Sequence, residues 1–117
     1  MRHVVCTLDE LPPGAMRSVT VDRVALVVLR TPDGEVRALR DACSHYGARL
    51  SRGTLRRMLV HDEEHGYRLL PDRYVVQCPW HGYEFDVADG RCPADPAHER
   101  VRSYRATVEG GSVVVER

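Results

Sequence analysis

The feature of this sequence that most constrains its fold is a series of short extended segments separated by turn signals. Eight segments of five to eight residues are rich in Val, Leu, Thr or Tyr, and they either alternate in polarity or run apolar. They read HVVCT, MRSVTV, VALVVLR, EVRALR, YVVQC, YEFDV, VRSYRATV and SVVVE. Three connections, TPDGE, VADGR and EGG, carry the Asp and Gly residues of hairpin turns. Since helical periodicity is almost absent, the sequence predicts an all-β antiparallel domain.

The length of the chain sets the number of domains. It has 117 residues, of which 43% are hydrophobic, and this is enough for one core and too little for two. We therefore expect a single domain over residues 1–117. The stretch RCPADPAHER, residues 91–100, is too rich in Pro and Ala to extend a strand, so we expect a surface loop there.

Charge and hydropathy exclude several kinds of partner. The formal net charge is zero, and no basic stripe suited to nucleic acid is apparent in the sequence, although every basic residue apart from His is Arg. No apolar run is long enough to span a bilayer, and MRHVVCTLDELPPG lacks the pattern of a secretory signal. We therefore expect a cytoplasmic monomer that binds neither nucleic acid nor membrane. In a reducing compartment, four cysteines point to metal binding more than to disulfides.

Two Cys/His pairs follow two of the predicted strands. Cys43 and His45 come after EVRALR, and Cys78 and His81 come at the end of YVVQC. A glycine follows each histidine within two residues, where the chain must turn sharply. Two thiolates and two imidazoles exclude Ca²⁺ and Mg²⁺, and they leave zinc, copper or an iron–sulfur cluster as the candidates.

The spacing Cys-x-His in one loop and Cys-x-x-His in the other, with CPWHG in the second, resembles the Rieske iron–sulfur proteins. The resemblance implies one [2Fe–2S] cluster per chain, with Cys43 and Cys78 on one iron and His45 and His81 on the other. It extends over DGEVRALRDACSHYGARLSRGTL, YEFDVADGRC and VRSYRATVEGGSVVVE. The implied fold is a Rieske-like antiparallel β-sandwich with two cluster-binding loops at one end.

The same resemblance implies a function. Rieske oxygenases that perform chemistry carry a second domain with a mononuclear iron, and this chain has no room for one. We therefore expect an electron-transfer protein with no catalytic residues, the ferredoxin component of a dioxygenase system. It would take electrons from a flavin-dependent ferredoxin reductase and deliver them to a separate terminal Rieske oxygenase. The alternatives are a small Rieske subunit of a reductase complex, similar to that of nitrite reductase, and a zinc-braced interaction module.

The zinc alternative fits the pattern of ligands less well. Common structural zinc modules pair Cys with Cys and His with His, whereas each loop of this chain brings one of each. The stretch CPWHG has no role in such a module that we can name.

One interval departs from the family pattern. Thirty-two residues separate His45 from Cys78, and in ordinary Rieske ferredoxins this interval is about half as long. We place an insertion at about Arg56 to Arg73 and expect a hairpin with MLV and YRLL as its arms and HDEEHG as its turn. It is either decoration or a determinant of partner choice.

The remaining candidates have simpler interpretations. We expect Cys6 and Cys92 to be packing residues, and HDEEH to be a solvated acidic segment because Asp62 stands where a zinc protease has Glu. Trp80 and Tyr83 either shield the cluster or form part of a docking face.

The loops also lack features of the high-potential Rieske proteins of respiratory complexes. Ala48 and Trp80 stand where those proteins have a bridging pair of cysteines, and Tyr83 and Phe85 stand where they have Ser and Tyr. The resemblance therefore implies a low-potential cluster.

Overall fold

The computed structural model describes residues 1–44 and 47–117, so His45 and Tyr46 lie outside the described part of the chain. Within the described part there are nine strands and two 3₁₀ helices. The strands are β1 (Arg2–Thr7), β2 (Met16–Val21), β3 (Val24–Arg30), β4 (Val36–Arg40), β5 (Thr54–Asp62), β6 (Gly66–Gln77), β7 (Glu84–Asp86), β8 (Ser103–Glu109) and β9 (Ser112–Glu116). The helices are η1 (Leu8–Glu10) and η2 (Leu50–Arg52).

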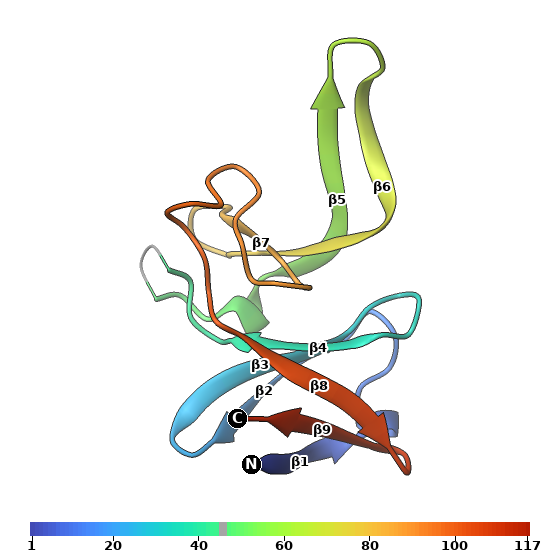
Figure 1. The fold of residues 1–117 in the computed structure, drawn as a ribbon, viewed down its shortest axis with the longest axis vertical. Coiled ribbons are helices and arrows are strands. Elements are labelled where there is room, and N and C mark those ends of the chain that lie inside the picture. Colours follow the sequence, from blue (N-terminus) through green and yellow to red (C-terminus); the bar gives the residue numbers. More distant parts are fainter. Residues whose placement is uncertain (45–46) are drawn as a thin grey trace.

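The strands form two antiparallel sheets (Figure 1). The larger sheet has the order β1-β9-β8-β4-β3-β2, and it curls until its edge strands β1 and β2 touch, which gives a near-barrel. The smaller sheet has the order β5-β6-β7. The all-β sandwich predicted from the sequence is confirmed, because the antiparallel ladders leave only two short helices in the described residues.

The central strand β3 shows why two layers form. Its sequence VALVVLR is apolar throughout, which is typical of a strand buried on both faces. Leu26 and Val28 point into the near-barrel, whereas Val27 and Leu29 pack toward the smaller sheet. The strand therefore contributes to two hydrophobic cores, one inside the near-barrel and one between the two sheets. The core between the sheets includes Tyr74, Val76 and Phe85 from β6 and β7, together with both candidate cysteine ligands.

The eight predicted strands are all present. MRSVTV, VALVVLR and SVVVE match β2, β3 and β9 from end to end, and the other five have shifted ends. YVVQC is the last part of the much longer strand β6, and YEFDV contributes only Glu84–Asp86. The predicted loop at 91–100 is confirmed, apart from a single bridge between Arg91 and Arg100.

The hairpin expected between the two Cys/His pairs is also confirmed, but its turn is shorter than predicted because His61, Asp62 and Gly66 pair in the strands. β5 and β6 pair from Asp62 opposite Gly66 down to Thr54 opposite Gln77, and Figure 1 shows the distal part projecting from the body of the molecule. Midway, Met58 alone stands opposite residues 70–73, so the ladder is interrupted there. HDEEH forms the exposed end of this hairpin, as predicted for a solvated segment.

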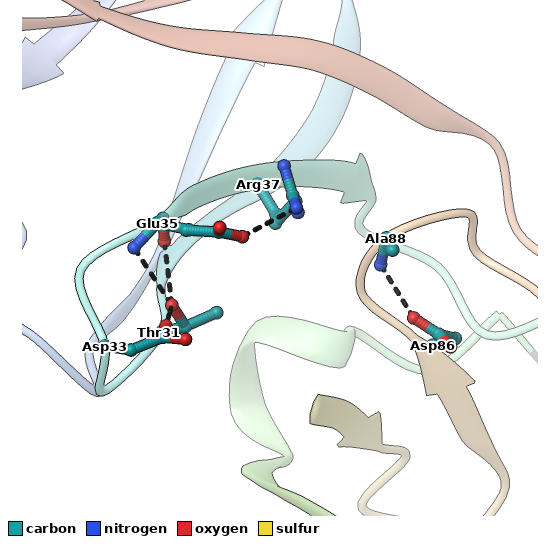
Figure 2. Close-up of polar contacts among 6 residues, drawn as sticks. All are labelled: Thr31, Asp33, Glu35, Arg37, Asp86 and Ala88. Carbon is teal, nitrogen blue, oxygen red and sulfur yellow. Dashed lines mark hydrogen bonds and ion pairs between the residues drawn. The ribbon is translucent and has the colours of Figure 1, made fainter. Parts of the chain in front are cut away.

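Side chains also organise the turn between β3 and β4, which Figure 2 shows. The backbone N–H of Thr31 donates to the carbonyl of Glu35, and the N–H of Glu35 donates back to the Thr31 hydroxyl, 3.0 Å away. Asp33 in the same turn accepts from that hydroxyl. The polar residues of TPDGE therefore close the hairpin that their sequence predicted.

Within residues 1–44 and 47–117, no helix is long and apolar enough to cross a membrane.

Candidate metal centre

The first Cys/His loop, residues 43–48, begins three residues after β4 ends. The Cys43 N–H donates to the carbonyl of Ala48, and the N–H of Gly47 donates to the carbonyl of Cys43. Gly47 has a φ of 73°, a conformation that side chains with a Cβ rarely adopt. The loop therefore closes on itself, and it places Cys43 on the core side with 4% exposure.

Asp41 anchors this loop. Its side chain is completely buried and accepts hydrogen bonds from the Ser18 hydroxyl, the Ser51 N–H and the Ser51 hydroxyl, at 2.7–2.8 Å. The guanidinium of Arg49 lies 3.5 Å from the same carboxylate. One carboxylate thus ties the approach to the first loop to β2 and to η2, and the hydrogen bonds offset the cost of burying its charge.

The second loop, residues 78–83, repeats the backbone pattern of the first. The Cys78 N–H donates to the carbonyl of Tyr83, and the N–H of Gly82 donates to the carbonyl of Cys78. Gly82 also has a φ of 73°. In each loop the cysteine N–H therefore bonds five residues ahead and the glycine N–H bonds four residues back, so the two loops present their cysteines in the same way.

The two loops converge on one core. Cys43 and Cys78, with 4% and 3% exposure, belong to the same cluster of buried apolar side chains between the sheets. A close approach supports this convergence: Gly53, just after η2, packs so tightly on the carbonyl of Gln77 that any Cβ there would clash with it. The chain leaving the first loop is thus held against the residue that precedes Cys78.

His81 occupies a different environment from the two thiols. His81 is exposed, and His45 lies outside the described residues. Within the described ranges, no three His, Cys, Asp or Glu side chains form a ready site for a metal ion. Of the predicted ligand set, the structure thus places the two cysteines in one buried core, and the assignment of the two histidines stays a prediction.

The donor chemistry nevertheless fits an iron–sulfur cluster. Two thiols at the edge of an apolar core, each on a loop whose backbone hydrogen bonds are internal, provide soft ligands in a site shielded from water. The exposed imidazole of His81 lies three residues after one of them, toward solvent. A cluster held between these loops would have a buried sulfur side and an accessible histidine side.

A third segment, residues 92–99, packs beside the two loops. The Ser44 hydroxyl of the first loop donates to Glu99, whose carbonyl accepts from the N–H of Cys92. Tyr83 of the second loop packs against the same core. The pKa of its hydroxyl is raised, first by desolvation and then by the negative charge of Glu99. The segment thus contacts both loops.

The other residues singled out in the sequence have structural roles or lie in solvent. Cys6 packs in the near-barrel, and Cys92 packs in the core between the sheets, as predicted. Burial raises the pKa of the Cys6 thiol. Trp80 is 63% exposed, which favours a docking role for it over a buried shield.

Sequence reasoning did not single out Asp41 or Glu99. Asp41 directly follows the buried segment VRALR, and a carboxylate at the end of such a strand is a signal that could have been used. Glu99 carries no such signal, because its contact with Ser44 spans 55 positions.

Comparison with known proteins gives consistent matches. A family model of the Rieske [2Fe-2S] domain matches residues 1–105. The ferredoxin component of the p-cumate 2,3-dioxygenase system of Pseudomonas putida is 31% identical over 113 residues, which cover 96% of this chain and 82% of that protein.

Solved structures also match over nearly the whole chain. The ferredoxin of carbazole 1,9a-dioxygenase from Nocardioides aromaticivorans has a TM-score of 0.74 and 32% identity, covering 98% of this chain and 96% of its own. A complex of reduced oxygenase and oxidized ferredoxin in carbazole 1,9a-dioxygenase contains a chain with a TM-score of 0.73 and 30% identity, covering 97% of this chain and 100% of that one. A putative NADH-dependent nitrite reductase small subunit from Mycobacterium tuberculosis has a TM-score of 0.81 and 28% identity, covering 100% of this chain and 95% of its own.

Proposed function

The chain belongs to the Rieske [2Fe–2S] domain family, and from this premise we propose that it is a one-electron carrier that passes electrons from a reductase to a separate oxygenase. It is an electron-transfer protein and not itself a catalyst. The observation that carries the proposal is the pair of matching loops, each starting with a buried cysteine in one shared core.

We assign the ligands by the family motif. Cys43 and Cys78 would hold one iron, and His45 and His81 the other. When bound, the [2Fe–2S] cluster supplies a centre that accepts and gives up one electron. The buried thiols and their apolar neighbours exclude water from the sulfur side, and the exposed His81 offers a short route to a partner.

The partners follow from the relatives. An oxidized ferredoxin has been solved in a complex with reduced oxygenase in carbazole 1,9a-dioxygenase, and the ferredoxin component from P. putida belongs to a dioxygenase system. We propose that this chain likewise delivers electrons to a terminal oxygenase, after accepting them from a flavin-dependent ferredoxin reductase. The oxygenase, and not this chain, would bind the organic substrate.

A second function has its own support. The nitrite reductase small subunit has the highest TM-score of the three structures compared above. The alternative function is therefore that of a permanent subunit of a reductase complex. The two functions differ in how the protein meets its partners. A carrier exchanges partners during turnover, whereas a subunit stays in its complex.

The experiment begins with the purified protein, which is expected to be red-brown with two irons and two acid-labile sulfides per chain. Zinc without sulfide would contradict the cluster and favour the zinc module. The reduced protein is then titrated with a terminal oxygenase from a dioxygenase system, and substrate hydroxylation is measured. Turnover that rises with the concentration of added carrier supports the carrier, whereas co-purification with a large reductase subunit supports the alternative.

We also propose that residues 1–117 act as one cytoplasmic, monomeric Rieske domain with an insertion at about 56–73. The two sheets share the core that holds Cys43 and Cys78, which supports a single unit. Analytical ultracentrifugation and cell fractionation test the monomer and the compartment. A stable dimer, or a protein recovered with membranes, would contradict this part of the proposal.

A further inference from the structure

An arginine-rich groove lies beside the first loop. It has a volume of about 410 Å³, and its lining includes Cys43, Ser44 and Gly47 of that loop. The groove is also lined by arginines from the end of β4 and from the approach to β8, namely Arg40, Arg100 and Arg102. All three are exposed, and no acidic residue among the described ones lines the groove, although the carboxylate of Glu99 accepts a hydrogen bond from the Ser44 hydroxyl at its edge.

The charges of these three arginines are not neutralised within the described part of the chain. None of them forms an ion pair there, whereas eight other arginines do. The guanidinium of Arg102 lies 5.2 Å from the centre of the Tyr104 ring, a contact that orients the side chain and leaves its charge in place. The groove therefore carries three positive charges in water.

A second groove extends the positive surface. It shares Arg40, Ala42 and Gly47 with the first groove, and it adds Arg23 and Arg49. Among the described residues its one acidic residue is Asp41, which is buried, hydrogen-bonded to Ser18 and Ser51, and 3.5 Å from the guanidinium of Arg49. Of the two added arginines, Arg23 forms no ion pair in the described part of the chain. We call the surface formed by Arg23, Arg40, Arg49, Arg100 and Arg102 the arginine rim.

The surface beside the second loop has the opposite charge. Among the described residues, the cavity next to Gly82 and Tyr83 is lined by Glu84, Asp95 and Glu99 and by no basic residue. Glu84 pairs with Arg56 outside this cavity, and Asp95 contacts His98, so Glu99 is the carboxylate there without an ion pair in the described part of the chain. Because the net charge of the whole chain is zero, the arginine rim is a local excess that the sequence composition conceals. The end of the molecule that carries the loops is thus positive on one side and negative on the other.

We propose that the arginine rim is the docking surface for a carboxylate-rich face of the redox partner protein. Charge complementarity argues for this occupant. A partner with Asp and Glu side chains would bind close to the first loop, and therefore close to a cluster bound by that loop. Opposite charges speed encounter by factors of about 10 to 10³ at low ionic strength, and they fix the orientation of docking. The inference rests on the proposed carrier function, since it names the chemistry of the carrier's partner.

Two haem proteins of opposite surface charge serve as probes: ferricytochrome b5, which is acidic around its haem edge, and ferricytochrome c, which is basic. The protein with its cluster loaded is reduced and mixed with each cytochrome in a stopped-flow instrument at about 10 mM and 200 mM ionic strength. For the unaltered protein, the rate with cytochrome b5 should fall steeply as salt is added.

The decisive variant changes Arg40, Arg100 and Arg102 to Gln. At 10 mM ionic strength it should reduce cytochrome b5 about tenfold more slowly than the unaltered protein, and the difference should shrink to about twofold at 200 mM. The rate with cytochrome c should stay the same or rise. The visible spectrum and midpoint potential are measured alongside, so that a change of driving force is separated from a change of docking.

The matched control changes Arg52, Arg57 and Arg105 to Gln. These arginines are exposed, form no ion pair within the described residues and do not line either groove, and their replacement removes the same net charge. The control should slow cytochrome b5 less than twofold. Equal effects of the two triple variants would overturn the proposal, because they would show that only net charge matters.

Other outcomes are also decisive. If the triple variant loses its cluster, the single changes Arg100→Gln and Arg102→Gln replace it, each with an expected slowing of about twofold. If the unaltered protein forms a dimer at low salt and the arginine variant does not, a second copy of this chain occupies the arginine rim, and the proposal is overturned. If the reduced, unaltered protein passes electrons to neither cytochrome nor to hexacyanoferrate(III), the carrier function itself fails, and this result is distinct from a failure of the arginine rim.

Discussion

The described ends of the first loop have the same backbone hydrogen bonds as the second loop, but the two loops have different surroundings. Each runs from a buried cysteine through a glycine with a φ of 73°, with the same two hydrogen bonds. Yet arginines without ion pairs line the groove beside the first loop, and carboxylates line the cavity beside the second. The comparison separates two tasks: the backbone of each loop presents a ligand, whereas the side chains around it determine what can approach.

The largest effect is expected from removing a predicted ligand from either loop, which tests whether both loops bind the cluster. Changing Cys43, His45, Cys78 or His81 to Ala is expected to abolish the visible absorption completely and to lower the melting temperature by roughly 10 °C or more, because cluster binding stabilises the folded state. Absorption spectra, iron analysis and thermal unfolding measure the effect.

Cys6→Ser and Cys92→Ser are the matched controls, since both thiols are also buried and lie outside the loops. Both variants should keep the spectrum. Loss of colour in Cys92→Ser, or its survival in Cys78→Ala, would mean that the ligand thiols are wrongly assigned.

The reduction potential tests how the residues around the second loop affect the cluster. Phe85, two residues beyond that loop, is fully buried and has no hydroxyl to donate to a cluster sulfur. Each donor of this kind would raise a one-electron potential by roughly 60 to 130 mV, since it stabilises the reduced state. We therefore expect a midpoint near the low end of the Rieske range, about −150 mV, that is nearly constant between pH 6 and 8.

Protein-film voltammetry across this pH range measures it. A midpoint well above zero, or one that falls steeply with pH, would instead indicate a cluster of the respiratory type.

The hydrogen bonds of the buried Asp41 carboxylate stabilise the approach to the first loop. Asp41→Asn should lower the free energy of unfolding by about 2 to 3 kcal/mol, because an amide cannot accept all the hydrogen bonds that the buried carboxylate receives from Ser18 and Ser51. The matched control is Asp89→Asn, whose carboxylate is exposed and accepts one bond from the Arg91 N–H. Guanidinium chloride unfolding should show a loss of less than about 1 kcal/mol for the control. Equal losses would show that Asp41 does not anchor the loop.

The smallest expected effect concerns the hairpin between the loops. Deleting residues 59–69 and joining Met58 to Leu70 through two glycines should leave the visible spectrum unchanged. The deleted part lies beyond the interrupted ladder at Met58, and its Tyr67 is 74% exposed. The base of the hairpin, Thr54–Arg57 paired with Tyr74–Gln77, is kept.

A cluster that fails to assemble in this variant would make the distal hairpin structural. An intact spectrum with slower electron transfer to the oxygenase would instead connect the hairpin to partner choice.

The sequence by itself determined the strand set and the family. Alternation of polarity, the apolar run of β3 and the Asp-Gly turns are local patterns, so they predict strands and hairpins without knowledge of their neighbours. The spacing of the two Cys/His pairs is likewise local. Because each pair is contained in a single loop, the motif predicts all four ligands without knowledge of the fold.

Only the tertiary structure decided what surrounds those loops. Arg40 and Arg102 lie 62 positions apart, and they face one groove because β4 pairs with β8. Asp41 meets Ser18 and Ser51 for a similar reason, since β2 and η2 pack beside the end of β4. Such contacts depend on which strands pair although they are far apart in the sequence. Local sequence patterns do not specify this pairing, because it is determined by the burial of the whole core.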